Sequence, residues 1–215
     1  MQKREKIVDL IQSVQLDREV TVMGWIRSFR NDRFIALNDG STIKTLQVVI
    51  DQENEDFALL KRFTVGAAIK ATGRIIESQG KGQSVELVAE TLVVLGDCDA
   101  DKYPLQPKKH SLEFLRDIAH LRVRTNTFSE VFRIRHAVTF AIHKFFNDKG
   151  FYNVHSPIIT GSDAEGAGEM FQVTTMDMNS IPLGEDGKVG YKQDFFGKAT
   201  NLTVSGQLQA ELAAL

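Results

Sequence analysis

The stretch Val20-Thr21-Val22-Met23-Gly24-Trp25-Ile26 decides the fold of the first part of the chain, because β-branched and aromatic side chains at this density favour a strand. Two more short strands are predicted close behind it, at 34–37 and 46–50. The sequence Asn38-Asp39-Gly40-Ser41 lies between these two strands and is a strong turn signal. We therefore expect a small β-rich domain to begin near residue 16.

Beyond these three strands the pattern predicts one helix and two further strands. Residues 57–63 place apolar side chains on one helical face, and strands follow at 67–75 and 85–95, separated by the turn Gly80-Lys81-Gly82. Five short strands with a helix between the third and the fourth are the order expected of an OB-fold, a small barrel that often binds oligonucleotides. Other five-stranded barrels give similar patterns, so the order alone leaves them open.

The flanking segments have a different character. Residues 1–15 show helical spacing of apolar side chains, and 97–109 lose periodicity and gather aspartates and prolines, as linkers do. A long amphipathic helix is predicted from Ser129 to Lys149, with Gly150 as its C-terminal cap. A strand is predicted at 151–159, followed by a glycine-rich region of loops, a short strand or turn at 202–204 and a final helix.

Composition sets limits on the class of protein. Hydrophobic residues make up 42% and charged residues 25%, which indicates a globular protein and excludes a disordered tail. The formal charge of −2 gives no global basic excess, although arginines cluster at 27–33 and 116–135, where a local patch could bind phosphate. One cysteine, Cys98, excludes an intrachain disulfide and a cysteine-built zinc site. No signal peptide or membrane-spanning run is evident, so a cytoplasmic location is expected.

Four parts of the chain carry a resemblance to a known family. They are Gly24-Trp25-Ile26-Arg27 with Phe34 and Gln47, Gly150-Phe151-Tyr152-Asn153-Val154-His155-Ser156-Pro157, Ala164-Glu165-Gly166-Ala167-Gly168-Glu169-Met170-Phe171, and Asp194-Phe195-Phe196-Gly197-Lys198 with Leu202-Thr203-Val204-Ser205-Gly206-Gln207-Leu208. Together they resemble the class II aminoacyl-tRNA synthetases of the aspartate/asparagine/lysine subgroup, in that family's order and over essentially the whole chain. The last two are close to those of asparaginyl members.

The resemblance implies an α+β multidomain protein. It comprises an N-terminal helix at 1–15, a five-stranded OB-fold anticodon-binding barrel at 16–98, a linker at 99–118, and the first part of a class II antiparallel-sheet catalytic domain at 119–215. The family's second and third motifs, which supply ATP-binding arginines, do not occur. We therefore interpret the chain as an N-terminal fragment that is inactive alone, with its catalytic residues unknown.

In the barrel, the resemblance implies that three residues read the tRNA anticodon. Phe34 falls where the family stacks the central uridine, Gln47 where an amide hydrogen-bonds that base, and Arg30 where a guanidinium meets base or phosphate. Stacking and amide pairing suit a splayed, single-stranded base. The alternative is a core aromatic at position 34 and an ordinary outward strand residue at position 47.

In the second domain, the resemblance implies an amino-acid pocket. Glu165 matches the carboxylate that pairs with the substrate ammonium group, and Ser205 and Gln207 lie in the segment that contacts the substrate. Aspartate-specific members carry a lysine where this chain has Ala210, so a buried substrate carboxylate would lack its partner, and Glu211 would repel it further. Asparagine, which is neutral, escapes both penalties.

The remaining implications concern closure, assembly and activity. Phe196, Gly197 and Lys198 match a loop that closes over the amino acid, and Gly150 and Pro157 belong to the helix–strand motif through which members form homodimers. The full-length enzyme is expected to activate asparagine with ATP and Mg²⁺ and to transfer it to tRNA(Asn). No metal site built from side chains is expected. The alternatives are an aspartyl-tRNA synthetase of the same subgroup and a non-catalytic OB-fold module that binds tRNA.

Overall fold

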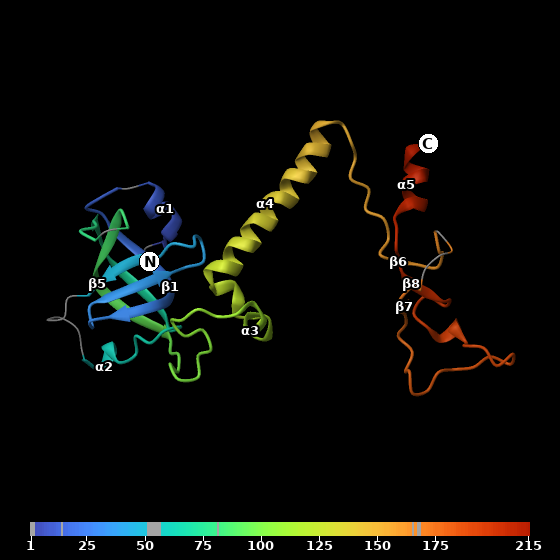
Figure 1. Cartoon of the computed structure of the whole chain (residues 1–215), viewed down its shortest axis with the longest axis horizontal. Helices are drawn as coiled ribbons and strands as arrows, with labels where there is room; N and C mark the ends of the chain where they lie inside the picture. Colours follow the sequence, from blue (N-terminus) through green and yellow to red (C-terminus); the bar gives the residue numbers. More distant parts are fainter. Residues whose placement is uncertain (1–2, 14, 51–56, 81, 165, 167–168) are drawn as a thin grey trace. The chain divides into compact units, whose positions relative to one another are not determined.

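The computed structural model describes residues 3–13, 15–50, 57–80, 82–164, 166 and 169–215. The chain divides into two compact units, Met1–Val138 and Thr139–Leu215. Figure 1 shows the elements of each unit in chain order, and one long helix, α4, contributes residues to both.

The first unit contains the five-stranded closed barrel that the sequence predicts, with strand order β1-β2-β3-β5-β4. Strands β3 and β5 pair in parallel, and every other neighbouring pair is antiparallel. A short helix, α2 (Phe57–Leu60), lies between the third and fourth strands as expected. The strands are β1 (Glu19–Arg30), β2 (Phe34–Asn38), β3 (Leu46–Val49), β4 (Ala68–Glu77) and β5 (Val85–Gly96).

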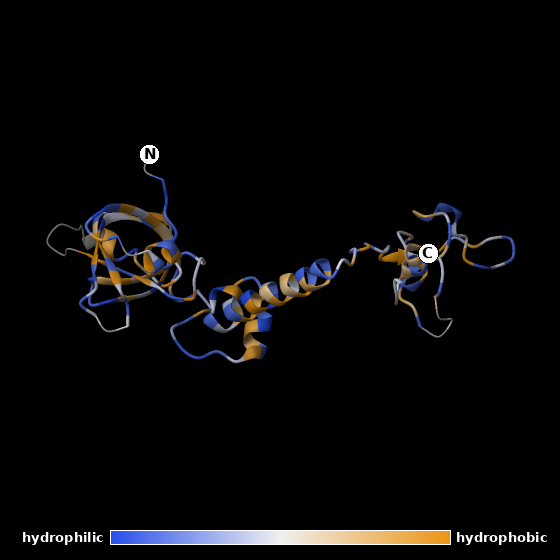
Figure 2. Ribbon diagram, turned by 90° about the horizontal axis from the view of Figure 1, so that it is seen from above, coloured by the Kyte–Doolittle hydropathy of each residue, from blue (hydrophilic) through white to orange (hydrophobic). Residues whose placement is uncertain are grey.

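The core of this unit fills the barrel. Strand side chains alternate between inside and outside, and the buried ones are aliphatic. Figure 2 shows hydrophobic and hydrophilic residues interspersed along the barrel strands. Each fully buried Ile or Leu stabilises the fold by about 1.5–3 kcal/mol relative to an exposed one. The inward set includes Ile26, Ile35, Leu37, Val48, Ile69 and Leu87.

Three irregularities in register shape the barrel wall. The pairing of β1 with β2 slips between Ile26 and Ser28. The pairing of β4 with β5 slips between Ala68 and Ile69 and again between Thr72 and Gly73. A Cβ at position 73 would lie 2.0 Å from the backbone oxygen of Val88, so glycine is required where the two strands approach this closely.

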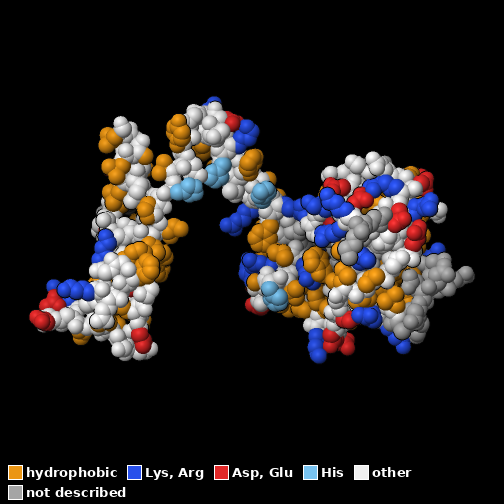
Figure 3. Space-filling view, turned by 180° about the vertical axis from the view of Figure 1, so that it is seen from behind, with side chains coloured by type: hydrophobic (Ala, Val, Ile, Leu, Met, Phe, Trp, Pro, Cys, Tyr) orange, Lys and Arg blue, Asp and Glu red, His pale blue; other side chains and the backbone are white. Residues whose placement is uncertain are grey.

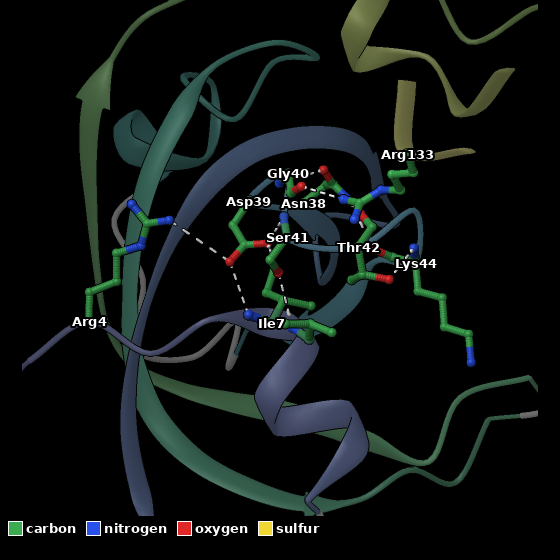
Figure 4. Close-up of polar contacts among 10 residues, drawn as sticks. Arg4, Ile7, Asn38, Asp39, Gly40, Ser41, Thr42, Lys44 and Arg133 are labelled. Atoms are coloured by element: carbon green, nitrogen blue, oxygen red, sulfur yellow. Dashed lines mark hydrogen bonds and ion pairs between the residues drawn. The ribbon is translucent and has the colours of Figure 1, made fainter. Parts of the chain in front are cut away.

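The N-terminal helix α1 (Ile7–Gln12) is shorter than the predicted 1–15. The N–H of Glu5 donates to the carbonyl of Thr21 at 2.9 Å, which holds the residues before the helix in an extended conformation against β1. Lys6 provides no side-chain cap; the N–H of Ile7 instead donates to Oδ2 of Asp39 at 3.0 Å. The turn between β2 and β3 therefore caps a helix that lies far from it in sequence (Figure 4).

Helix α4 (Asn126–Asp148) begins three residues before the predicted Ser129, because the hydroxyl of Thr125 accepts the N–H of Phe128 and caps it. Its C-terminal end matches the prediction. Gly150 has φ +86°, and its N–H donates to the carbonyl of Asn147. The N–H of Phe151 donates to the carbonyl of Phe146. Two short helices precede α4, α3 (Leu112–Asp117) and the 3₁₀ turn η1 (Arg122–Arg124).

The second unit holds a small antiparallel sheet with strand order β6-β8-β7. The strand predicted at 151–159 is wrong for most of its length, since β6 begins only at Ile159. A strand needs a neighbouring strand whose backbone groups hydrogen-bond with its own. Just before β6, the N–H of Thr203 donates one such hydrogen bond to the carbonyl of Ile158. The elements are β6 (Ile159–Thr160), β7 (Gln172–Val173), η2 (Tyr191–Gln193), β8 (Thr200–Leu202) and α5 (Gln207–Ala214).

Candidate functional site

The register slip in β1 creates a polar outer face on the barrel. Ile26 points into the core and Phe29 packs against it, so the two residues between them cannot alternate normally. Arg27 is the extra residue of a β-bulge, and both it and Ser28 are half-buried on the outside of the wall, with Arg30 exposed beyond them. One added residue therefore brings two arginines and a serine to the same face.

The structure brings the three predicted anticodon-reading residues together on this outer face. Arg30 on β1 lies directly opposite Phe34 on β2, and Gln47 on β3 lies opposite Ala36, two residues along β2 from Phe34. Phe34 is half-buried rather than a core residue, and the guanidinium carbon of Arg33 lies 5.6 Å from the centre of its ring. An aromatic face, an amide and a guanidinium thus occupy three adjacent strands.

Glu86, which sequence reasoning missed, holds the amide of Gln47. The two residues are paired across β3 and β5, and Nε2 of Gln47 donates to Oε2 of Glu86 at 3.0 Å. The hydroxyl of Ser78 donates to the same oxygen at 3.1 Å, and Glu86 is 8% exposed. The carboxylate fixes the amide while leaving its oxygen and one N–H for a ligand.

In the second unit, the predicted amino-acid-binding residues gather at the start of α5. The hydroxyl of Ser205 accepts the N–H of Gln207 at 3.1 Å, and Nε2 of Gln207 donates to Oε1 of Glu211 at 2.8 Å. Ala210 is exposed on the same helix, one turn after Gly206. The turn into α5 packs closely, because a Cβ at Gly206 would lie 2.6 Å from the hydroxyl of Ser156.

The predicted substrate loop begins at an anchored aspartate. Oδ1 of Asp194 accepts the N–H and the hydroxyl of Thr175, both at 2.9 Å, and the N–H of Phe195 at 2.8 Å. The Thr175 N–H, helped by the Thr174 hydroxyl and the Phe195 N–H, lowers the pKa of Asp194 to about 2. The resemblance includes Asp194 as the start of this loop, but nothing in the sequence shows that the end of β7 lies beside it.

Beyond Asp194 the loop is exposed. The N–H of Gly197 donates to the carbonyl of Asp194 at 2.9 Å, and Gly197 has φ +64°, which closes a tight turn. Phe196 and Lys198 are exposed. This loop precedes β8 whereas α5 follows it, so the two predicted groups lie at opposite ends of one strand. Glu165, the predicted partner of the substrate ammonium group, lies outside the described residues.

The predicted dimer motif is strongly apolar and exposed. Pro157 is exposed in the segment before β6, and Gly150 ends α4 as described above. Figure 3 shows apolar side chains on the surface, and those of α4 and the following segment account for many of them. They include Ile134, Phe140, Ile142, Phe145, Phe151, Tyr152 and Ile158.

In the part of the chain that the structure describes, no group of three or more His, Cys, Asp or Glu side chains is arranged to hold a metal ion. None of the helices in this part is both long enough and apolar enough to cross a membrane.

Comparison with known protein families divides the chain between residues 95 and 111, ahead of the boundary between the two compact units at Val138 and Thr139. Residues 20–95 match the family of OB-fold nucleic acid binding domains, and residues 111–211 match the family of class II tRNA synthetases (D, K and N). Residues 111–211 therefore form a class II tRNA synthetase domain of the D, K and N group. The barrel is the OB-fold of this synthetase, and the second unit lies in its partial catalytic domain.

Two curated relatives of the chain are both named asparagine–tRNA ligase. The chain is 56% identical to the asparagine–tRNA ligase of Cytophaga hutchinsonii over 99% of its own length, and 54% identical to that of Parabacteroides distasonis over 99%. It spans about half the length of these relatives, 47% and 46% respectively.

Solved structures confirm the fold. Asparaginyl-tRNA synthetase from Pyrococcus horikoshii, complexed with asparaginyl-adenylate, superposes with a TM-score of 0.75 at 18% identity and covers 99% of this chain and 45% of its own. A putative aspartyl-tRNA synthetase from Leishmania major Friedlin superposes with a TM-score of 0.74 at 15% identity and covers 99% of this chain and 40% of its own. The fold is therefore shared by synthetases named for different amino acids, and it does not decide which amino acid a chain with this fold uses.

Proposed function

We propose that this synthetase chain is the tRNA-reading and part of the amino-acid-binding region of an asparagine–tRNA ligase, which activates asparagine with ATP and transfers it to tRNA(Asn). The identity of 51–56% to proteins of that name, over nearly the whole chain, supports this choice. The observation that carries the proposal is the outer face of the barrel, where Arg30, Phe34 and Gln47 lie on adjacent strands.

In this proposal the barrel reads bases by stacking and hydrogen bonding. An unstacked base lies on the exposed part of the Phe34 ring, a contact worth about 1–3 kcal/mol. Gln47, held by Glu86, presents its amide oxygen and remaining N–H to the edge of that base. Arg30, which is exposed beside Phe34, contacts a base edge or a phosphate.

We propose that the start of α5 selects asparagine over aspartate. Ala210 offers no cation to a substrate carboxylate, and Glu211 adds a negative charge within the same helix, so aspartate would be bound without a partner. Gln207 and Ser205 contact the backbone groups of the amino acid, and Glu165 pairs with its ammonium group. The loop Phe196–Lys198 then covers the substrate and excludes water.

ATP, Mg²⁺ and a second subunit complete the proposal. Asparaginyl-adenylate in the Pyrococcus horikoshii relative supports the use of ATP. The described residues contain no acidic cluster suited to Mg²⁺, so no step through the metal is assigned to them. Gly150 and Pro157 belong to the surface through which a homodimer would form, and we expect the protein to act in the cytoplasm.

Phe34→Ala tests the reading of RNA by the barrel. Loss of a stacking contact of about 1–3 kcal/mol should weaken binding of an asparagine anticodon stem-loop about 5- to 150-fold, measured by fluorescence anisotropy with labelled RNA. Leu95→Ala is the matched control, because it removes an exposed apolar side chain on β5, beyond the residues that pair with β3. Equal binding by Phe34→Ala and the unmutated chain, or an equal loss in both variants, would contradict the proposal.

A further inference from the structure

Polar contacts join helix α4 to the barrel at two separate points, both within the first unit. At the first point, the guanidinium of Arg27 on β1 donates to the backbone carbonyl of Arg124 and to Oδ1 of Asn126, the latter at 3.3 Å. At the second point, further along the helix, Nη2 of Arg133 donates to the carbonyl of Gly40 at 2.6 Å (Figure 4). The second contact joins the helix to the turn between β2 and β3.

The turn that receives Arg133 is held firmly by a buried amide. Asn38, which is 8% exposed, donates from Nδ2 to the carbonyls of Thr42 and Lys44 at 2.9 and 2.8 Å. Its Oδ1 accepts the N–H of Gly40 at 2.9 Å. The turn joins β2 to β3, the strands that carry the proposed aromatic and amide base-reading side chains. Arg133 therefore contacts an ordered extension of those strands.

The Arg133 contact is directional. Nε of Arg133 donates to the hydroxyl of Ser129, one turn earlier on the same helix, at 3.4 Å, which orients the guanidinium. A charged donor on a neutral carbonyl makes a stronger hydrogen bond than two neutral groups do. The acceptor is a backbone oxygen, so the contact depends on the shape of the turn and not on a side chain at position 40.

Close packing does not fix the direction of this helix in the part of the chain that the structure describes. No side chain of α4 is buried there. A cavity of about 650 Å³ lies between the barrel and the first turns of the helix. Its lining includes Trp25, Gly40 and Thr42 from the barrel and Phe132, Arg133 and His136 from α4. The polar contacts at the two points therefore matter more here than they would beside a filled core.

The spacing of the two points gives Arg133 leverage over the helix. Arg133 lies seven residues after Asn126, and Asp148, the last residue of α4, lies 22 residues after it. At about 1.5 Å per residue, the two points are about 10 Å apart and the helix extends about 33 Å from the first. A helix held only at the first point can pivot there, so a displacement of about 1 Å at Arg133 becomes about 3 Å at Asp148.

We propose that Arg133 is a positioning residue for the transfer step. It holds α4 in one direction from the barrel, so that a tRNA whose bases are bound at Phe34 and Gln47 presents its 3′ end productively. This role rests on the proposed function, because it requires bases read on the barrel and chemistry in the domain that α4 enters. Arg133 itself contacts neither the RNA nor the amino acid. A group of this kind changes the rate of reaction between bound partners and leaves the binding of each unchanged.

Arg133→Gln tests this role in a protein that spans the full length of the relatives. The measurement is the single-turnover rate of transfer from the preformed adenylate to saturating, intact tRNA(Asn). This rate should fall about 10- to 100-fold, because a misplacement of about 1 Å far from the chemistry can cost about 100-fold. Asparagine-dependent pyrophosphate exchange and binding of the anticodon stem-loop should each stay within about twofold of the unmutated protein. Arg133→Lys keeps a charged donor and should recover part of the transfer rate.

Lys144→Gln is the matched control, because it removes a cation from the same helix. The ammonium of Lys144 contacts Asp148 within α4 at 2.6 Å, so its loss should leave all three measurements unchanged. A loss confined to transfer in Arg133→Gln, with the control unchanged, supports the positioning role. Loss of exchange or of stem-loop binding in Arg133→Gln would overturn it by showing general damage, and an equal loss of transfer in the control would overturn it as an effect of helix charge.

The same measurements separate this role from the function on which it rests. An unchanged transfer rate in Arg133→Gln, while Phe34→Ala weakens binding of the stem-loop, would overturn the positioning role and leave the proposed function standing. Failure of the unmutated full-length protein to charge tRNA(Asn) with asparagine would overturn both.

Discussion

Removing the carboxylate of Asp39 should destabilise the barrel, because this one side chain joins α1 to the turn between β2 and β3 (Figure 4). Oδ2 accepts the N–H of Ile7, the first residue of α1, at 3.0 Å. Oδ1 accepts the N–H and the hydroxyl of Ser41 at 3.0 and 2.6 Å. The side chain has no exposed surface, and Arg4 approaches to 3.9 Å. Asp39→Ala would remove all of these contacts together.

The magnitude follows from the donors that lose their acceptor. Ile7 is fully buried, so its N–H would be left without a partner, at a cost of about 1–3 kcal/mol. Ser41 is half-buried and water can replace part of its contact, so about 0.5–1.5 kcal/mol is expected there. Loss of a negative charge at a helix N-terminus adds a few tenths of a kcal/mol. The sum is about 2–5 kcal/mol.

Urea unfolding followed by fluorescence measures this loss, because Trp25, the single tryptophan, lies in β1 and reports on the barrel. Asp39→Asn is the matched control, since it keeps the size and one acceptor and should lose about 1 kcal/mol. Burial alone would raise the pKa of Asp39, but hydrogen bonds from Ser41 and Ile7 outweigh it and lower the pKa from 3.8. The unmutated chain should therefore be more stable to unfolding than Asp39→Asn above pH 3.8, and this difference should be lost as the pH falls through the lowered pKa of Asp39.

A free energy of unfolding for Asp39→Ala within about 0.5 kcal/mol of that of the unmutated chain would refute this reasoning, since substitutions at ordinary surface positions change it by no more than that. A loss as large in Asp39→Asn would also refute it, because the effect would then follow from charge and not from the missing acceptor.

Three other predictions concern the second unit. The pKa of Asp194 is lowered to about 2, so its contribution to loop stability is present above pH 3.8 and lost as the pH falls through about 2. The NMR amide signal of Thr175, which donates to this carboxylate, should therefore titrate with a midpoint near 2. A midpoint at 3.8 would contradict the anchoring role of Asp194. Gly150→Ala should destabilise α4 by about 1 kcal/mol, because φ +86° disfavours a side chain; circular dichroism during unfolding measures it, with Gly187→Ala (φ +74°) in a loop as the control that should leave the helix signal unchanged. Ala210→Lys, in a protein that spans the full length of the relatives, should lower asparagine-dependent pyrophosphate exchange at least about tenfold and favour aspartate; unchanged discrimination would sink the role proposed for Ala210.

The barrel and the C-terminal end of α4 were predictable because their signals are local. Strands with inward aliphatic side chains, the turn at 38–41 and the glycine at 150 each depend on residues within a few positions of one another. The strand predicted at 151–159 failed for the opposite reason. A strand is defined by its partner, and a sequence pattern contains no information on whether a partner is present beside that segment.

The candidate site was predictable in part. Arg30, Phe34 and Gln47 could be named because they match a family pattern, and the structure places them on one face. Glu86 could not be named, since its contact with Gln47 depends on the parallel pairing of β3 with β5 across 39 residues of sequence. Asp194 was missed similarly, because its partner Thr175 lies 19 residues away on another segment.

Charge shows most clearly what sequence reasoning leaves out. A net charge of −2 argues against nucleic-acid binding only if the charges are spread evenly, and the fold makes them uneven. The bulge at Arg27 brings Ser28 and Arg30 to the outer face that Arg27 occupies, and the chain returns 97 residues later to place the carbonyl of Arg124 against Arg27. The cations of β1, the β2–β3 connection and the linker become one surface only through that return. The RNA site that we propose would therefore be a property of the folded barrel together with its linker, and a barrel separated from residues 103–127 should bind RNA with a weaker dependence on salt.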